Sequence, residues 1–256
     1  MPPKIVLQDP VLGPLTDDLL TRDVRVFQRA KGHRFSSDDV ATAYVAHRAR
    51  PDARRVLDLG TGLGSVLLLL AWKLGEAELC GVEAQAMSFE LLTRNVARSG
   101  FQDRVRVRHG DLRDPGLLAG FERQFDLITG TPPYFPPQAA LEAEDEQRAY
   151  ARIEYRGGVE AYIEAGAPLL APGAALVLCG DARAEERVVK ASRAASLALV
   201  GRAAVVARAG ELPLFSIWTL SHTARPFVAE TLTLRGPSGE RTPDAQSLRE
   251  FSGFGH

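Results

Sequence analysis

From residue 55 onward, short apolar runs alternate with longer stretches in which apolar side chains recur every three or four residues. The first pattern is typical of buried strands, and the second of helices that pack on them. The predicted strands are Arg55–Gly60, Ala77–Glu83, Arg104–Arg108, Phe125–Gly130 and Ala174–Cys179. The predicted helices are Gly64–Leu74, Ala86–Ser99, Gly158–Leu170 and Ala182–Ala195. This βαβα order predicts an α/β fold with a mainly parallel, doubly wound sheet.

The pattern changes in the last third of the chain. Two strand-like runs, Ala203–Ala207 and Leu214–Ser221, are separated by only six residues. So short a connection permits only an antiparallel pair. The run Phe227–Leu234 can add one more strand.

The two ends of the chain carry weaker signals. We place no firm element in the first 27 residues and a helix over Asp39–Arg48. The residues beyond 235 are rich in glycine, serine, proline and charge, which is typical of mobile segments. We therefore expect an N-terminal cap over 1–50, a main domain over 51–235 and a mobile tail over 236–256.

The composition excludes several classes of protein. With 256 residues, 45% hydrophobic and 25% charged, the chain has the make-up of a soluble globular protein. No apolar stretch approaches the roughly 20 residues that span a bilayer, and the N-terminus lacks a signal pattern. Cys80 and Cys179 lie in apolar runs and are expected to be reduced core thiols. We expect a cytoplasmic protein without a membrane segment or a metal site.

The charge balance gives no direct sign of a nucleic-acid partner. The formal net charge is −1, so no global basic field attracts phosphates. Only four of the 31 basic residues are lysine, and arginine binds phosphate better than lysine because its guanidinium can donate two parallel hydrogen bonds. A GC-rich genome produces the same arginine bias without any selection for binding.

A glycine-rich turn follows the first predicted strand. The segment Asp58–Gly64 contains Gly60, Gly62 and Gly64, with Ser65 at the position where a dinucleotide-binding turn has its third glycine. Asp58 precedes the first glycine by two residues, where it would repel a pyrophosphate. Both departures favour a ligand that carries positive charge and no phosphates.

Two acids follow the next two predicted strands. Glu83 ends the second strand, where a carboxylate can accept both hydroxyls of a ribose. Asp111, followed by Leu112, comes after the third strand, where its oxygen can accept from an adenine amino group. Each acid alone is equally consistent with a helix cap or a solvated loop. Together they describe an adenosine with an amino-acid or sulfonium tail.

The fourth predicted strand ends in Thr131-Pro132-Pro133-Tyr134. Proline lacks an N–H and fixes φ, so the two prolines extend the chain and leave carbonyl oxygens free to accept hydrogen bonds. Tyr134 offers a face for stacking on a flat ring. A plain proline-rich turn is the alternative for this tetrapeptide taken by itself.

Taken in order and spacing, Asp58–Gly64, Glu83, Asp111 and Thr131–Tyr134 resemble the class I S-adenosylmethionine-dependent methyltransferases. The resemblance implies a Rossmann-like seven-stranded sheet, mainly parallel with an antiparallel C-terminal strand and helices on both faces. It also implies S-adenosyl-L-methionine as the cofactor. The implied cofactor contacts are Asp58, Gly60, Gly62, Gly64, Glu83, Asp111 and Leu112.

Methyl transfer from a sulfonium is a direct displacement, so such an enzyme mainly aligns the nucleophile and excludes water. The family resemblance implies that Thr131, Pro132, Pro133 and Tyr134 are the catalytic group. The side chain of Thr131 and the carbonyl of Pro132 would accept the two amine protons, while Tyr134 stacks on the ring. The family usually has Asn, Asp or Ser at the first position. Thr131 is shorter than an amide, which leaves the acceptor geometry open.

Flanking segments resemble one group within that family more closely. Gln28–Asp38, Arg208–Phe215 and Leu234–Pro243 are similar to bacterial tRNA adenine-N6 methyltransferases, of the tRNA-Val type, that modify an adenine beside the anticodon. The resemblance covers roughly residues 28 to 243. It implies that the first segment folds over the cofactor, with Phe35 and Ser36 near it and Arg34 near the substrate.

A charged insert, Glu142–Arg156, follows the tetrapeptide and Phe135. Arg148, Arg152 and Arg156 recur at every fourth position, which predicts one basic face of a helix. That face could hold RNA phosphates. A solvated, ion-paired helix is the alternative, because acidic residues flank the arginines. The candidate substrate contacts are Arg34, Phe135, Arg148 and Arg152.

The leading hypothesis is a methyltransferase for an exocyclic amine of a nucleobase in tRNA or another structured RNA, with adenine N6 as the acceptor. One alternative keeps the cofactor but changes the acceptor to a protein glutamine amide or a small molecule. Another is a catalytically silent module with the same fold. The oligomeric state and the target position stay open.

Overall fold

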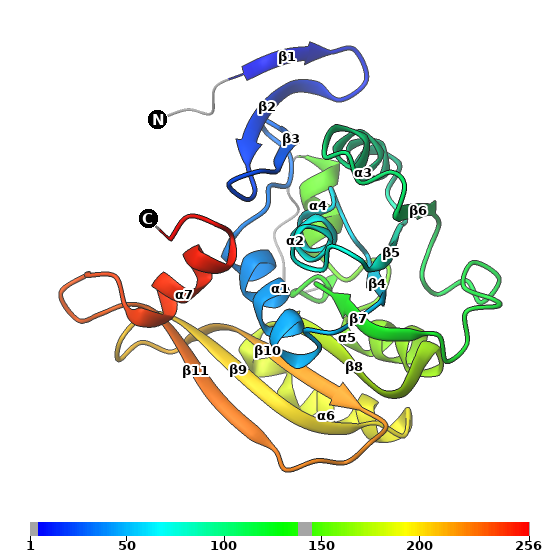
Figure 1. Ribbon diagram of the computed structural model, residues 1–256, viewed down its shortest axis with the longest axis vertical. Helices are drawn as coiled ribbons and strands as arrows, with labels where there is room; N and C mark the ends of the chain where they lie inside the picture. The colour runs from blue at the N-terminus through cyan, green and yellow to red at the C-terminus, as the bar shows by residue number, and fades with distance from the viewer. Residues whose placement is uncertain (1–4, 138–144, 256) are drawn as a thin grey trace.

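The apolar runs of the main domain become the strands of one large sheet in the computed structural model, which describes residues 5–137 and 145–255. These strands are β4 (Arg55–Leu59), β5 (Glu78–Glu83), β6 (Val105–His109), β7 (Phe125–Gly130), β8 (Leu170–Gly180), β9 (Ala198–Arg208), β10 (Pro213–Ser221) and β11 (Val228–Arg235). Their spatial order is β11-β9-β10-β8-β7-β4-β5-β6 (Figure 1). The chain therefore builds the sheet outward from β4 and then crosses to the other half at β7.

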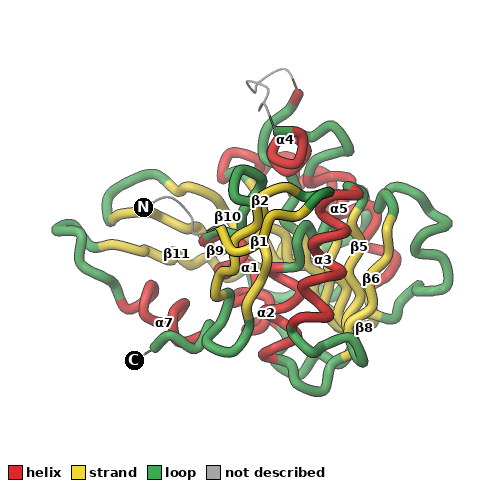
Figure 2. The backbone as a smooth tube through the Cα atoms, turned by 90° about the horizontal axis from the view of Figure 1, so that it is seen from above, coloured by secondary structure: helices red, strands yellow, loops and turns green. Residues whose placement is uncertain are grey.

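Helices cover both faces of this sheet (Figure 1). The described helices are α1 (Ser37–Ala49), α2 (Ser65–Lys73), α3 (Ala86–Arg98), α4 (Glu146–Arg152), α5 (Val159–Gly166), α6 (Glu185–Ala194) and α7 (Pro243–Phe251), with short 3-10 turns at η2 (Ala167–Leu169) and η3 (Ala182–Ala184). α4 lies apart from the helices that pack on the sheet (Figure 2). Among the described helices, none has the length and apolar character needed to cross a bilayer.

Alternating side chains of the strands divide the interior into two hydrophobic cores. Val56 of β4 and Leu127 of β7 belong to the core under α1, α2 and α3. Their neighbours Leu57 and Ile128 belong to the core under α5 and α6. Because both faces are buried, most residues of these strands are apolar, which is why the strands stand out in the sequence.

The predicted sheet is confirmed, with one more strand than expected. β10 runs antiparallel to both of its neighbours, β8 and β9, and the other described pairs of this sheet are parallel. The seven strands from β4 to β10 form the expected arrangement. β11 extends the sheet to eight strands, with Val228 opposite Gly201 of β9.

A small N-terminal sheet was not predicted. It consists of β1 (Ile5–Asp9), β2 (Gly13–Leu19) and β3 (Arg25–Arg29), paired antiparallel, and Figure 2 shows it lying over the helical layer beside α3. Asn95 of α3 holds it, because its side chain accepts from the Phe27 N–H at 2.7 Å and donates to the Leu63 carbonyl at 2.9 Å. Alternating hydrophobicity is interrupted in β2 by Asp17 and Asp18, so the strand gives no clear sequence signal.

The prediction of a mobile tail over 236–256 is wrong for α7. Thr242 caps this helix by accepting from the Ala245 N–H at 3.1 Å, and Pro243 occupies the first turn. Leu248 and Phe251 are buried, and the Phe251 ring meets Tyr44 of α1 edge to face, with 5.6 Å between centroids. The composition misleads here because the polar residues lie on the exposed face of a docked helix.

The docking of α7 can be tested with Phe251→Ala. The ring is 6% exposed, so its removal leaves a cavity beside α1, and the free energy of unfolding should fall by about 3 kcal/mol. Urea denaturation measures the change. Leu212→Ala is the control, because Leu212 is 87% exposed and its truncation should change the free energy of unfolding by less than about 0.5 kcal/mol. Equal midpoints for the two variants would mean that α7 does not pack as described.

Candidate functional site

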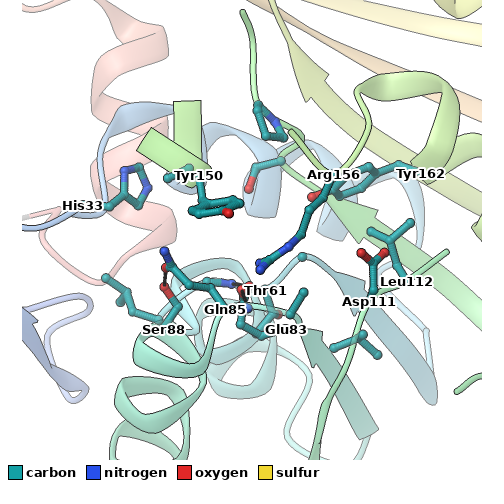
Figure 3. A pocket seen from close by; sticks show the side chains of 18 of the residues that line it. His33, Thr61, Glu83, Gln85, Ser88, Asp111, Leu112, Tyr150, Arg156 and Tyr162 are labelled. Carbon is teal, nitrogen blue, oxygen red and sulfur yellow. Dashed lines mark hydrogen bonds between the residues drawn. The ribbon is translucent and has the colours of Figure 1, made fainter. Parts of the chain in front are cut away.

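A cavity opens where β4, β5 and β7 end (Figure 3). Parallel strands place their carboxyl ends at one edge of the sheet, so residues far apart in the sequence meet there. Seven of the predicted site residues line this cavity: Gly60, Gly62, Glu83, Asp111, Leu112, Thr131 and Pro133. The predicted cofactor and acceptor segments therefore converge on one place.

The glycine turn connects β4 to α2 and needs glycine for two different reasons. Gly60 and Gly62 both have left-handed backbone conformations, with φ of 60° and 59°. A Cβ atom at Gly60 would overlap the hydroxyl of Tyr162, whereas a Cβ atom at Gly62 would meet nothing within 4 Å. Gly60 thus lets α5 approach the turn, and Gly62 keeps the cavity open.

Asp58 lies behind the turn and is 2% exposed. Its carboxyl accepts hydrogen bonds from the hydroxyls of Thr61 and of Thr129, the latter at 2.7 Å. Burial raises the pKa of Asp58 to about 6. Asp58 does not line the cavity, and neither does Gly64, the N-cap of α2. Their predicted direct contact with a cofactor stays a prediction, while their position shows that they shape the turn.

Glu83 is held by the backbone on both sides. Its carboxylate oxygens accept from the Gly62 N–H at 2.8 Å and from the Gln85 N–H at 2.7 Å. Burial raises the pKa of Glu83, and these two bonds oppose that rise. The carboxylate is therefore fixed at the cavity wall with lone pairs left for a ligand.

Asp111 is more exposed and forms an ion pair with Arg113, with 2.6 Å between the charged atoms. That hydrogen bond holds the pKa of Asp111 below its ordinary value. Leu112 adds an apolar contact beside it at the cavity wall. The two predicted acids thus lie in different environments, one buried and one at the rim.

Three cavity residues from the insert and α5 were not among the predicted contacts. Arg156 extends into the cavity between Tyr150 and Glu83 (Figure 3), and its guanidinium lies 4.4 Å from the Tyr150 ring centroid. Tyr162 closes the floor beneath Gly60. Tyr150 and Tyr162, close in sequence to Arg156, could have indicated this part of the site, because aromatic residues and arginine recur around flat ligands.

The prediction that three arginines share one helical face is wrong. α4 ends at Arg152, and the following residue, Ile153, is extended. The chain then turns, so Arg156 enters the first cavity while Arg148 and Arg152 line a second one. The part of the charged insert before residue 145 lies outside the described residues.

A second cavity adjoins the first. Its walls include Pro132, Tyr134 and Phe135 from the end of β7, together with Arg34, Arg148 and Arg152. The structure therefore separates the predicted substrate contacts from most of the predicted cofactor contacts. Thr131 lines both cavities and lies on their border.

The side chains around the second cavity are partly engaged. The Tyr134 hydroxyl donates to Asp38 at 3.0 Å and lies 2.9 Å from the Cys179 sulfur, so the ring is anchored at its far end. Arg34 forms an ion pair with Asp18 at 2.9 Å. The guanidinium of Arg152 lies over the Phe135 ring, 5.6 Å from the centroid.

Phe35 and Ser36 line neither cavity. Ser36 is the N-cap of α1 and forms a capping box with Asp39. Phe35 packs against the core. Their predicted contact with a cofactor stays a prediction.

Residues 30–147 match the family model of the methyltransferase small domain. The chain is 39% identical over 124 residues to a tRNA1(Val) (adenine(37)-N6)-methyltransferase of Porphyromonas gingivalis, covering 48% of each protein. It spans about half the length of that relative. An enzyme of the same name from Actinobacillus pleuropneumoniae is 26% identical over 81% of this chain and 84% of its own.

A relative with a different acceptor also matches. The ribosomal protein uL3 glutamine methyltransferase of Bradyrhizobium diazoefficiens is 32% identical over 126 residues, which are 49% of this chain and 38% of that protein. The shared part again falls short of the whole relative.

Solved structures show the fold. Protein Atu636 of Agrobacterium tumefaciens, a predicted O-methyltransferase, superposes with a TM-score of 0.65 at 18% identity, covering 85% of this chain and 97% of its own. P. horikoshii TYW2 in complex with MeSAdo has a TM-score of 0.55 at 16% identity, covering 80% and 70%.

The two glycines of the turn can be distinguished by substitution. Gly62→Ala should lower the free energy of unfolding by about 1–2 kcal/mol, the cost of a side chain in the left-handed region. Gly60→Ala should lower it further, because the buried Tyr162 must also move. Urea denaturation of both variants measures the difference. Equal losses would show that Tyr162 does not approach Gly60 as described.

Proposed function

We propose that this chain is a class I S-adenosylmethionine-dependent methyltransferase that transfers a methyl group to an exocyclic amine of a nucleobase in structured RNA. The preferred acceptor is adenine N6 of tRNA. The observation that carries the proposal is the meeting of two cavities at Thr131, one lined by the glycine turn and the other by the prolines and Tyr134.

The first cavity suits the cofactor S-adenosyl-L-methionine. Glu83 has free lone pairs for the two ribose hydroxyls, and Gly62 lets the cofactor approach the turn without a side chain in the way. Asp111 at the rim can accept from the adenine amino group. The acids around the turn favour a sulfonium over a phosphate, because like charges repel.

The second cavity suits a flat acceptor base. Tyr134 offers an anchored ring for stacking, and the Pro132 carbonyl and the Thr131 hydroxyl offer hydrogen-bond acceptors for an amine. The amine nitrogen attacks the methyl carbon, and the sulfur leaves with the electron pair of the broken bond. The chain contributes alignment and exclusion of water.

RNA is supported as the substrate by two features. Arg148 and Arg152 line the second cavity, and neither forms an ion pair within the described residues. Guanidinium groups that line such a cavity without a carboxylate partner can hold phosphates. The relatives named as tRNA adenine-N6 methyltransferases include one that aligns over 84% of its length.

A protein glutamine amide is the second candidate acceptor. It is favoured by the uL3 glutamine methyltransferase relative. Thr131 leaves room for it, because it departs from the Asn, Asp or Ser that families methylating planar amine or amide nitrogens usually have. An amide nitrogen presents the same planar pair of protons as the adenine amine, so both acceptors fit the same hydrogen-bond arrangement.

The cofactor half of the proposal is tested by calorimetry with S-adenosyl-L-methionine. Glu83→Gln should weaken binding by about tenfold or more, because it removes the charge from two hydrogen bonds to the ribose. Glu211→Gln, in the exposed β9–β10 connection, is the control and should bind as the wild type does. A folded wild-type protein that binds no cofactor would instead support a silent binding module.

The acceptor half is tested by incubating the protein with labelled cofactor and, separately, total tRNA, total protein or a metabolite extract. Label is expected in tRNA as N6-methyladenosine. Label confined to the protein fraction would favour the glutamine acceptor, and label confined to the extract a small molecule.

Variants of Tyr134 test the stacking role in the same assay. Tyr134→Ala should lower kcat/KM by about 10- to 100-fold, the usual value of one base–aromatic stack, with little change in cofactor affinity. Tyr134→Phe keeps the ring and loses only the hydrogen bond to Asp38, so its loss should be smaller. Full turnover by Tyr134→Ala would show that the acceptor assignment is wrong.

A further inference from the structure

Four residues line both cavities: His33, Asp39, Thr131 and Ala151. Because the methyl group must pass from one cavity to the other, side chains on this border face the reacting atoms in the proposed reaction. Asp39 is the carboxylate among the four, and neither sequence patterns nor the family resemblance pointed to it.

Thr131 supplies only part of what the acceptor nitrogen needs. A planar amine presents two protons, and one of them must leave once the nitrogen carries the methyl group. A threonine hydroxyl can accept a hydrogen bond, but it is a poor base and reaches less far than an amide or carboxylate. The border therefore requires a second group that can take a proton.

The structure holds Asp39 in place for this task. It lies in the first turn of α1 and is 7% exposed. Its two oxygens accept separately from the Ser65 hydroxyl and from the Ser36 N–H, both at 2.8 Å. A carboxylate has about four acceptor sites, so lone pairs remain for a ligand. One bond comes from each of two helix starts, which fixes the orientation of the carboxyl group.

The surroundings make this carboxyl group a base near neutral pH. Burial raises the pKa of Asp39 to about 7, and the charge of Asp38 adds to the rise, while the bonds from Ser36 and Ser65 oppose it. The titratable groups around it are Asp38 on α1, Asp58 on β4, Cys179 on β8, and Tyr134 and His33 in the flanking segments. A base with a pKa near the working pH is the most effective.

We propose that Asp39 is a catalytic residue that accepts a hydrogen bond, and then the proton, from the acceptor nitrogen, and so provides the charge that Thr131 lacks. The inference rests on the proposed methyl transfer. In that step the nitrogen–carbon bond forms, the sulfur–carbon bond breaks, sulfur retains the electron pair, and the displaced proton moves to the Asp39 carboxylate. The proton then returns to solvent when the product leaves.

The main test is Asp39→Asn, which keeps the shape and one acceptor oxygen but removes the charge. We expect kcat for methyl transfer to the labelled fraction to fall by about 30-fold or more, with the cofactor Kd within about threefold of wild type. The wild-type rate should rise with pH through about 7, because the carboxyl group must be ionised, and this rise should vanish in Asp39→Asn. Asp52→Asn, whose side chain is 75% exposed, is the control and should keep the wild-type rate and profile.

Two further variants separate a catalytic from a structural role. Ser65→Ala removes a bond that lowers the pKa of Asp39, so the midpoint of the pH profile should move upward. Asp39→Glu keeps an ionisable carboxyl group at the border, so it should retain at least tenfold more of the wild-type rate than Asp39→Asn does. A merely structural Asp39 would produce neither effect.

The outcomes distinguish this inference from the proposed function. A wild-type protein that labels no fraction would overturn the methyl transfer itself, and the role of Asp39 with it. An active wild type with an Asp39→Asn rate within twofold and an unchanged pH profile would overturn the role of Asp39 alone. The same conclusion would follow if Asp39→Asn failed to fold and the Ser65→Ala midpoint did not move.

Discussion

The buried carboxyl group of Asp58 is the point on which the site depends. It accepts from Thr61 in the glycine turn and from Thr129 in β7, and so joins the end of the first parallel strand to the end of the fourth. The turn positions Gly62 to donate to Glu83 on β5. β7 positions Thr131 two residues beyond Thr129. The two hydrogen bonds that Asp58 accepts therefore help to position residues of both cavities.

Such an arrangement costs stability, because several acids are desolvated together. Burial raises the pKa of Asp58 to about 6 and of Asp39 to about 7, both from an ordinary value of 3.8. The folded state therefore binds these protons more tightly than the unfolded state, and the stability that both groups contribute falls as the pH rises from about 4 through 6 and 7. A bound cation would offset the repulsion. A cluster of this kind is typical of a functional site rather than of a structural core.

Much of the fold could be predicted from the sequence, and the failures have particular causes. The strands β4, β5 and β7 are buried on both faces, so their apolar runs were unambiguous. The N-terminal sheet was missed because Asp17 and Asp18 interrupt β2, although ion pairs with Arg25, Arg98 and Arg34 neutralise them in the folded chain. The prediction of a mobile tail is wrong because α7 is stabilised by the packing of Phe251 against Tyr44 of α1. Because α1 is about 200 residues away in the sequence, the composition of the tail does not indicate this contact.

The order of the strands and the residues at their ends follow from the amino-acid sequence, because hydrophobic periodicity and glycine conformation are local properties. It placed Glu83, Asp111 and Thr131 at one edge of the sheet. The folded chain is needed to see that Arg156 enters the first cavity, apart from Arg148 and Arg152, and that Asp39 lies on the border with Thr131. Those placements depend on where α4 ends and on how α1 packs against α2, which are contacts between distant segments.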